Sequence, residues 1–575
     1  MTTRFVTMCC VSEMHIFLRP FCRVVLLGLF GALASTLSAT ESDVTASNLL
    51  VQTAQGTLGG EISHSHPSVR SYKGIPYAAA PIGNLRWQAP QSAAAWPGTR
   101  DATEFGNRCV QPKIETGFYA TDDQPMSEDC LFLNVWTSSP APDAKQPVMV
   151  WIHGGAFIMG SGSESIYHGD ALAQDGVVVV TINYRLGLYG FFAHPVLSKE
   201  SSTDTSGNQG LQDQIAALKW VQENIAAFGG DAENVTIFGE SAGSISVCYL
   251  VATPLAKGLF HKAIGQSGGC YQKHATLEEP GSEISFLGNA EQDNRAGYAI
   301  GREVAAALGA AGVSPDALEI MRSLSTTEIS TKLLSAGVVM PWRSIFVDGY
   351  VFPKQMRMLH AQGQASNVDS LIGSTKDEGI MLFTDVEELS LDEWAASIRT
   401  NTPKYADQLI AAYDEDAQKS TKLAQQEMMS DAVFGAEMRT WAQLVESRNR
   451  NSYVYIFNHA PPIEGMGRNL GAFHGGEIQY VFQSHNGEAN EDGLPALWDE
   501  TDREVARLMR GYWVNFARTG NPNGNGLPIW PTYSVQTNRS MAIQANAQAV
   551  KDLRKAKFDV HEQIMRDGFA GAQTL

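Results

Sequence analysis

The sequence predicts an α/β protein built on a mostly parallel, doubly wound sheet. Two runs rich in β-branched residues, 148–152 and 177–182, are almost wholly apolar, as in strands that helices cover on both faces. The segment 209–228 instead repeats its apolar residues at helical spacing, which predicts an amphipathic helix. Strands that alternate with helices over hundreds of residues predict a parallel sheet between two helical layers.

The same alternation continues toward the C-terminus. We expect a short strand at 235–238 that ends at a glycine, and further strands at 370–373 and 453–457. The less regular interval 271–355 is expected to form a helical cap on the sheet. The pattern therefore predicts that residues 49–575 form a single domain.

The N-terminus has the pattern of a secretory signal peptide. Arg19 and Arg23 precede an apolar run at 24–34, which ends in the small-x-small pattern that a signal peptidase reads. The run is too short to span a bilayer, and no later stretch of the sequence is long and apolar enough to do so. We expect residues 1–39 to be a signal peptide and the protein to be exported, as a periplasmic or secreted protein.

The sequence also suggests where the signal peptide begins and ends. Met14 is a candidate for the true start of the chain, and cleavage is expected near 34–39. Residues 40–48 are polar and are expected to form a linker. The folded domain is therefore expected to begin at residue 49.

The charge of the chain argues against one class of partner. Its 575 residues include 61 acidic and 42 basic side chains, which give a formal net charge of −19. Binding of nucleic acid depends on basic patches that neutralise phosphates, so we expect no nucleic-acid partner. The sequence contains neither a zinc-ligand constellation nor a phosphate-binding loop, and we expect neither a metal nor a nucleotide cofactor.

The seven cysteines fall into two groups. Three lie in the segment that is predicted to be removed, namely Cys9, Cys10 and Cys22. In an oxidising compartment Cys109 and Cys130 could close a short loop, which would stabilise the fold by about 3 kcal/mol. Cys248 and Cys270 are expected to be small buried hydrophobic residues, because free cysteine commonly packs in this way.

A candidate nucleophile lies in Gly239-Glu240-Ser241-Ala242-Gly243. A Gly-x-Ser-x-Gly match occurs easily by chance in a chain with 53 glycines. Here, however, it directly follows the strand expected at 235–238 and opens a helix-like segment at 242–250. A nucleophile elbow has this arrangement, since a strained turn lifts the serine hydroxyl clear of the sheet at a helix N-terminus. The context therefore predicts Ser241 as a nucleophile.

A glycine loop after an earlier strand is a candidate oxyanion hole. His153-Gly154-Gly155-Ala156 follows the run at 148–152 directly. In an elbow enzyme, an oxyanion is held by backbone N–H groups of such a loop and of the residue after the nucleophile. We expect the N–H groups of Gly154, Gly155 and Ala242 to fill this role.

The base and the acid should follow the serine in the chain, in the order serine, acid, histidine. Earlier histidines lie too close to the nucleophile to leave room for the acid, so four remain as candidates for the base, namely His459, His474, His485 and His561. His474 is favoured because it lies in a glycine-rich loop after the strand expected at 453–457. For the acid, Asp377 and Glu378 both follow the strand expected at 370–373, and the residues alone do not separate them.

Longer segments resemble a known family. The run Phe228–Gly243 is similar throughout to the type-B carboxylesterase and cholinesterase signature, and Glu128–Trp136 is similar to a second signature of that family. Lys73–Ala78 also resembles a family segment, as does Trp513–Ala517 together with Gly520–Pro522. The resemblance runs from about residue 49 to about 533, and is strongest to the bacterial carboxylesterases of the type-B carboxylesterase/lipase family. It implies the α/β-hydrolase fold and hydrolysis of a small-molecule ester.

The resemblance also implies roles for individual residues. The segment around Glu378 is similar to the one that carries the family's triad glutamate, and the segment around His474 to the one with the catalytic histidine. Three further residues match positions in the hydrogen-bond network around that histidine, namely Glu240, Ser267 and Glu477. Cys109 and Cys130 match the family's first disulfide.

Departures from the family bear on the substrate. Choline-binding members carry a Trp inside the first disulfide loop, whereas this loop has Phe118 and Tyr119 but no Trp, so we do not expect a true cholinesterase. Trp342 and Arg343 lie shortly before Val347–Gly349, which resembles the family segment after the acyl-pocket loop. There, Arg343 could favour esters with a free carboxylate, although a solvated surface arginine is the simpler interpretation.

Two alternatives to an esterase follow from the same residues. The fold also carries non-catalytic interaction or adhesion modules, because fold does not determine function. Amidase or lipase activity would use the same nucleophile.

Overall fold

The computed structural model describes residues 49–568, except for 115–122, 282–294, 315, 339–344, 464, 466, 485–494 and 496. Leu49–Leu575 forms one compact unit. The predicted signal peptide (1–39) and linker (40–48) lie outside the described residues.

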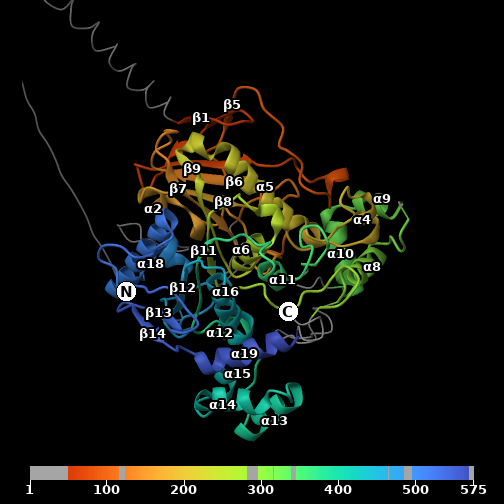
Figure 1. Ribbon diagram of the computed structural model, residues 1–575. Coiled ribbons are helices and arrows are strands. Elements are labelled where there is room, and N and C mark those ends of the chain that lie inside the picture. The colour runs from red at the N-terminus through yellow and green to blue at the C-terminus, as the bar shows by residue number, and fades with distance from the viewer. Residues whose placement is uncertain are drawn as a thin grey trace, which may run out of the picture. The chain divides into compact units, whose positions relative to one another are not determined.

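An eleven-stranded sheet forms the centre of this unit (Figure 1). In spatial order its strands are β14 (Gln548–Lys551), β13 (Arg539–Ile543), β12 (Ser452–Phe457), β11 (Asp369–Thr375), β10 (Lys262–Gln266), β9 (Gly230–Glu240), β7 (Gln146–Ile152), β8 (Val178–Ile182), β6 (Phe132–Thr137), β4 (Arg70–Pro76) and β3 (Glu61–Ile62). A separate sheet contains β1 (Leu50–Gln52), β2 (Thr57–Gly59) and β5 (Thr99–Asp101).

The middle of the large sheet is parallel, as the sequence predicts. All pairs from β8 through β7, β9, β10, β11 and β12 to β13 are parallel, and antiparallel strands lie only toward the two edges. The five predicted strands correspond to β7, β8, β9, β11 and β12. Because parallel strands present their carboxyl ends at one edge of the sheet, the loops after β7, β9 and β11 meet there.

Helices complete the fold on both sides of the sheet. The helices of the first half are α2 (Asp170–Gln174), α3 (Gly187–Phe191), α4 (Pro195–Glu200), α5 (Gln209–Asn224), α6 (Ala242–Ala252), α8 (Gly297–Ala307), α9 (Asp316–Ser323) and α10 (Thr326–Ala336). Those of the second half are α11 (Met356–Ala361), α12 (Gly379–Leu382), α13 (Leu391–Asn401), α14 (Ala406–Ala417), α15 (Thr421–Ser430), α16 (Ala436–Glu446), α17 (Ile478–Phe482), α18 (Glu500–Thr519) and α19 (Lys555–Gly568).

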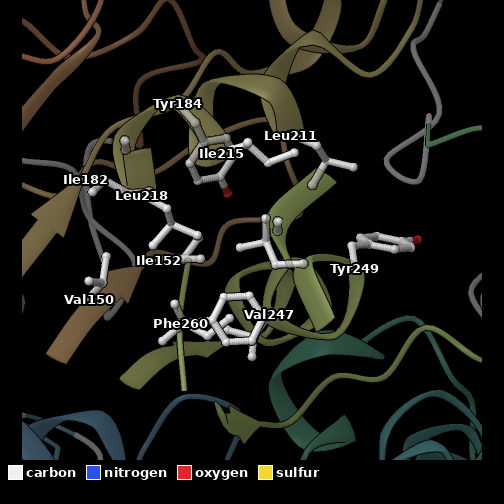
Figure 2. Packing of buried hydrophobic residues seen from close by; sticks show 14 of the residues in the cluster. Val150, Ile152, Ile182, Tyr184, Leu211, Ile215, Leu218, Val247, Tyr249 and Phe260 are labelled. Atoms are coloured by element: carbon white, nitrogen blue, oxygen red, sulfur yellow. The ribbon is translucent and has the colours of Figure 1, made fainter. Parts of the chain in front are cut away.

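The continuous apolar strands are explained by burial on both faces. Along β7, Val148, Val150 and Ile152 enter one core together with residues of α5 and α6, and Figure 2 shows part of this packing. The alternate residues Met149 and Trp151 enter a second core together with residues of α17 and α18. A strand buried on both sides has no polar face, so its sequence shows no alternation.

Two groups of helices lie outside these layers. In the predicted cap interval 271–355, α8, α9 and α10 share a core with the α3–α4 segment, and they gather on one side of the sheet in Figure 1. A second group, α13–α15, packs on α19. The sequence does not predict this second group as a separate layer, because its apolar residues are spaced like those of any amphipathic helix.

Two disulfides link the described cysteines. Cys109 and Cys130 are bonded, as the resemblance implies. Cys248 and Cys270 are also bonded, with a Cα separation of 5.8 Å, so the prediction of two free buried thiols is wrong. Cys248 lies on α6, which follows β9, and Cys270 lies just after β10, the strand paired with β9. Their proximity comes from sheet pairing, which no local pattern in the sequence reveals.

No helix in the described part of the chain combines the length and the apolar character that a membrane span requires.

Replacing both Cys248 and Cys270 with alanine should lower the free energy of unfolding by about 3 kcal/mol, because the loop they close spans 22 residues. Guanidinium unfolding of the double variant measures this loss. The Cys109→Ala/Cys130→Ala variant is the matched control, since its loop spans 21 residues. Thiol titration of denatured, unreduced protein in which Cys9, Cys10 and Cys22 are absent should find no free thiol. Two free thiols would contradict the second bond.

Candidate active site

Ser241 occupies a strained turn between β9 and α6. Its φ of 55° and ψ of −123° lie in a region that non-glycine residues rarely adopt. A Cβ at Gly239 would lie 2.6 Å from the carbonyl oxygen of Ile152, and one at Gly243 would overlap that same oxygen. The two glycines of the motif are therefore required by the close approach of β7. The turn holds a partly exposed Ser241 between buried neighbours.

The Gly154–Gly155 loop lies against this turn. A Cβ at Gly154 would lie 2.8 Å from Oε2 of Glu240 and 3.2 Å from Cβ of Ser241, so the two backbones are nearly in contact. Gly155 has a φ of +95°, which favours glycine. Within the described part of the chain, the N–H groups of Gly154, Gly155 and Ala242 donate no backbone or side-chain hydrogen bond. These donors are available to an oxygen bound beside Ser241.

His474 is held by a carboxylate from the neighbouring loop. Its Nδ1 lies 2.5 Å from Oε2 of Glu378, and the other oxygen of Glu378 accepts a 2.8 Å bond from the N–H of Thr375. Both side chains are almost fully buried. The carboxylate of Asp377 instead accepts a bond from the N–H of Ala472. Of the two candidate acids, Glu378 therefore contacts the imidazole, whereas Asp377 bonds to the backbone of the loop that carries it.

The other histidine candidates lie elsewhere. His459 contacts Asp502, with 2.7 Å between its Nε2 and the carboxylate. His561 contacts the hydroxyl of Tyr413 at 2.9 Å. His485 lies outside the described residues.

Two further carboxylates surround the imidazole. Oε1 of Glu240 lies 3.2 Å from Nε2 of His474. Glu477 accepts a 3.2 Å bond from the side chain of Gln266, whose carbonyl oxygen accepts the N–H of Ser241. The structure therefore links Glu477 to the turn that carries Ser241. Ser267 is fully buried with a φ of 58°, and the described residues offer its hydroxyl no hydrogen-bond partner.

The charges of this cluster shift one another's protonation. Burial lowers the pKa of His474, but the carboxylates of Glu240 and Glu378 outweigh it and raise that pKa to about 9. Burial raises the pKa of Glu240 to about 8, against the opposing charge of His474. Burial and the charge of Glu378 raise the pKa of Glu477 to about 7. The cluster therefore holds protons near neutral pH, as expected when several acids share a buried site.

The sequence does not reveal the side chain that packs on the imidazole. The ring of Phe434 lies 4.8 Å from that of His474, between centroids. Phe434 belongs to a π-helical turn, Asp431–Gly435, inserted between α15 and α16, and Arg554 bonds both carboxylate oxygens of Asp431. A π-turn inside a helix changes which residues face inward, so helical spacing could not identify this residue.

Four residues predicted to line the substrate pocket lie outside the described residues, namely Phe118, Tyr119, Trp342 and Arg343.

Comparison with known sequences gives consistent matches along the chain. The profile of the carboxylesterase family matches residues 47–561. The para-nitrobenzyl esterase of Bacillus subtilis (strain 168) is 34% identical over 521 residues, which cover 88% of this chain and 97% of that protein. The fumonisin B1 esterase of Sphingopyxis macrogoltabida is 34% identical over 503 residues, which cover 86% of this chain and 87% of that protein.

Solved structures give the same result. A PNB esterase structure superimposes with a TM-score of 0.73 at 31% identity, covering 89% of this chain and 99% of that one. A carboxylesterase from Geobacillus stearothermophilus superimposes with a TM-score of 0.72 at 33% identity, with the same coverage. The sheet described above is therefore that of an α/β-hydrolase.

Replacing Glu240 with glutamine should lower the pKa of the His474 imidazole, because it removes a close opposite charge. NMR titration of the labelled imidazole measures the shift. Glu415→Gln is the control, since the Glu415 side chain is 88% exposed. An imidazole pKa unchanged from that of the unsubstituted protein would contradict the described electrostatics.

Proposed function

Because this chain belongs to the carboxylesterase family, we propose that it hydrolyses a carboxylic ester through an acyl-enzyme formed on Ser241. The observation that carries this proposal is the buried contact between His474 and Glu378, at 2.5 Å. The second nitrogen of that imidazole faces Glu240, the residue before Ser241. Nucleophile, base and acid thus come from loops at one edge of the sheet, in the order expected for this fold.

In the first step Ser241 attacks the ester carbonyl. Its Oγ forms a bond to the carbonyl carbon while His474 Nε2 accepts the hydroxyl proton. The Nδ1 proton of His474 stays on the ring and is donated as a hydrogen bond to the Glu378 carboxylate, which keeps the ring oriented and stabilises the imidazolium. The strained turn favours this step because it exposes the hydroxyl at the N-terminus of α6.

The tetrahedral intermediate carries a negative oxygen. The N–H groups of Gly154, Gly155 and Ala242 stabilise that oxygen, and each such donor is worth about 3 kcal/mol in a transition state. Because the two loops already lie in contact, little reorganisation is needed when the charge develops. The imidazolium then gives its proton to the leaving oxygen, and the alcohol departs.

Water completes the cycle. It attacks the acyl-enzyme carbonyl while His474 takes its proton, and the same N–H groups hold the second intermediate. The Ser241 oxygen then leaves and recovers the proton from His474. One ester and one water give one carboxylic acid and one alcohol, and the enzyme is unchanged.

We also propose that the protein is exported to an oxidising compartment. Two disulfides support this proposal, because such bonds form and persist outside the reducing cytosol. The signal-like segment at 1–39 supplies the route.

Replacing Ser241 with alanine should lower kcat for a para-nitrophenyl ester by a factor on the order of 10⁴ to 10⁶, because the covalent step is lost. Steady-state hydrolysis by the purified variant measures the loss. The control is Ser323→Ala, at an exposed serine on α9. Ester turnover that persists in Ser241→Ala would rule out the proposed mechanism, and a matched anilide that reacts as fast as the ester would favour an amidase.

A further inference from the structure

Asp377 makes a reciprocal pair of bonds with the loop that carries His474. Its N–H donates to the carbonyl oxygen of Ala472 at 2.9 Å, and one of its carboxylate oxygens accepts the N–H of Ala472 at 2.8 Å. The two residues are 95 positions apart in the chain. Two bonds between the same pair of residues limit both the distance and the rotation between the loops.

The partner loop is shaped to receive this carboxylate. Gly471 has a φ of +59°, and a Cβ there would lie 2.9 Å from the carboxylate carbon of Asp377. Only glycine combines this conformation with such a close approach at low cost. The backbone of the His474 loop therefore fits around the Asp377 side chain.

A backbone bond fixes the other end of the same loop. The N–H of Lys376 donates to the carbonyl oxygen of Phe457 at 2.9 Å, at the end of β12. The segment 376–377 thus binds the His474 loop where it begins and again two residues before His474. Glu378, the next residue, then contacts the imidazole.

We propose that Asp377 is a positioning residue that sets the register between Glu378 and His474 through its hydrogen bonds to Ala472. This inference rests on the proposed function, because it assigns His474 and Glu378 as base and acid. Ala472 is two residues from His474, and Asp377 is adjacent to Glu378. A shift of one loop relative to the other would therefore change the 2.5 Å distance between Glu378 and Nδ1 of His474.

The carboxylate acts here as a hydrogen-bond acceptor rather than as a charge. The nearest cation in its ion pairs is Lys376, at 3.9 Å, and the Asp377 side chain is about a quarter exposed. Such a pair is weak in water. An asparagine at this position keeps an acceptor oxygen of the same shape and removes the charge, whereas an alanine removes both.

The test compares Asp377→Ala with Asp377→Asn. We expect the alanine variant to lose kcat by about 10- to 100-fold, the scale of a small misplacement of catalytic groups, with a much smaller change in KM. The asparagine variant should recover most of that loss. Active-site titration expresses kcat per functional site, and Asp407→Ala, at a carboxylate that is 95% exposed, is the matched control.

The pH profile separates positioning from general destabilisation. In Asp377→Ala the acid limb of kcat/KM should move to lower pH, because a displaced Glu378 no longer raises the pKa of His474 as strongly. In Asp377→Asn the limb should stay near its original position. An equal loss of kcat in both variants would mean that the charge matters, and would overturn the proposal. An alanine variant with the original kcat and the original pH profile would also overturn it.

A second route applies if Asp377→Ala folds poorly. Gly471→Ala would press a methyl group against the Asp377 carboxylate, and should lower kcat through the same contact. Its effect should be smaller when Asp377 is already serine than in the unsubstituted protein, because the shorter side chain leaves room for the methyl group, as in a double-mutant cycle for coupled residues. Additive effects would overturn the proposal.

Failure of this proposal can be told from failure of the proposed function. If activity depends on Ser241 but is indifferent to Asp377, only the positioning role is wrong. If Ser241→Ala retains ester turnover, the proposed function itself is wrong.

Discussion

The backbone of Ser241 adopts a conformation that side-chain-bearing residues rarely occupy, with φ 55° and ψ −123°, and the rest of the site depends on it. The surrounding structure supports this strain through close packing, since a Cβ at Gly154, Gly239 or Gly243 would collide with the turn or with the end of β7. Strain of this kind costs about 1–3 kcal/mol and persists only where the fold over-determines it. Here the parallel pairing of β7, β9 and β10 provides that constraint.

Buried charge is the second constraint. Three carboxylates, those of Glu240, Glu378 and Glu477, lie around one imidazole in an almost fully buried site. Their mutual repulsion and their burial favour protonation of Glu240 and Glu477, so the cluster carries less net charge than its composition suggests. Glu378 contacts Nδ1 of His474, and this contact would stabilise the imidazolium that the proposed mechanism forms.

Local patterns predicted the parts of the fold that local interactions specify. The strands at 148–152 and 235–238 and the turn at Ser241 follow from apolar runs and glycine positions. The bond between Cys248 and Cys270 and the packing of Phe434 on His474 depend on strand pairing and on a π-turn. Which of Asp377 and Glu378 contacts His474 depends on the folded loop, because adjacent acids in one turn differ only in where they point.

In the proposed mechanism, loops at one edge of the sheet bring nucleophile, oxyanion donors and base together around a single bound carbonyl. A crystal structure of the protein after reaction with an alkyl phosphonate tests this most directly, because the phosphonyl group mimics the tetrahedral intermediate. We expect a bond to Oγ of Ser241, with the phosphonyl oxygen about 2.7–3.1 Å from the N–H groups of Gly154, Gly155 and Ala242. An adduct on another residue, or an oxygen directed away from those donors, would contradict it.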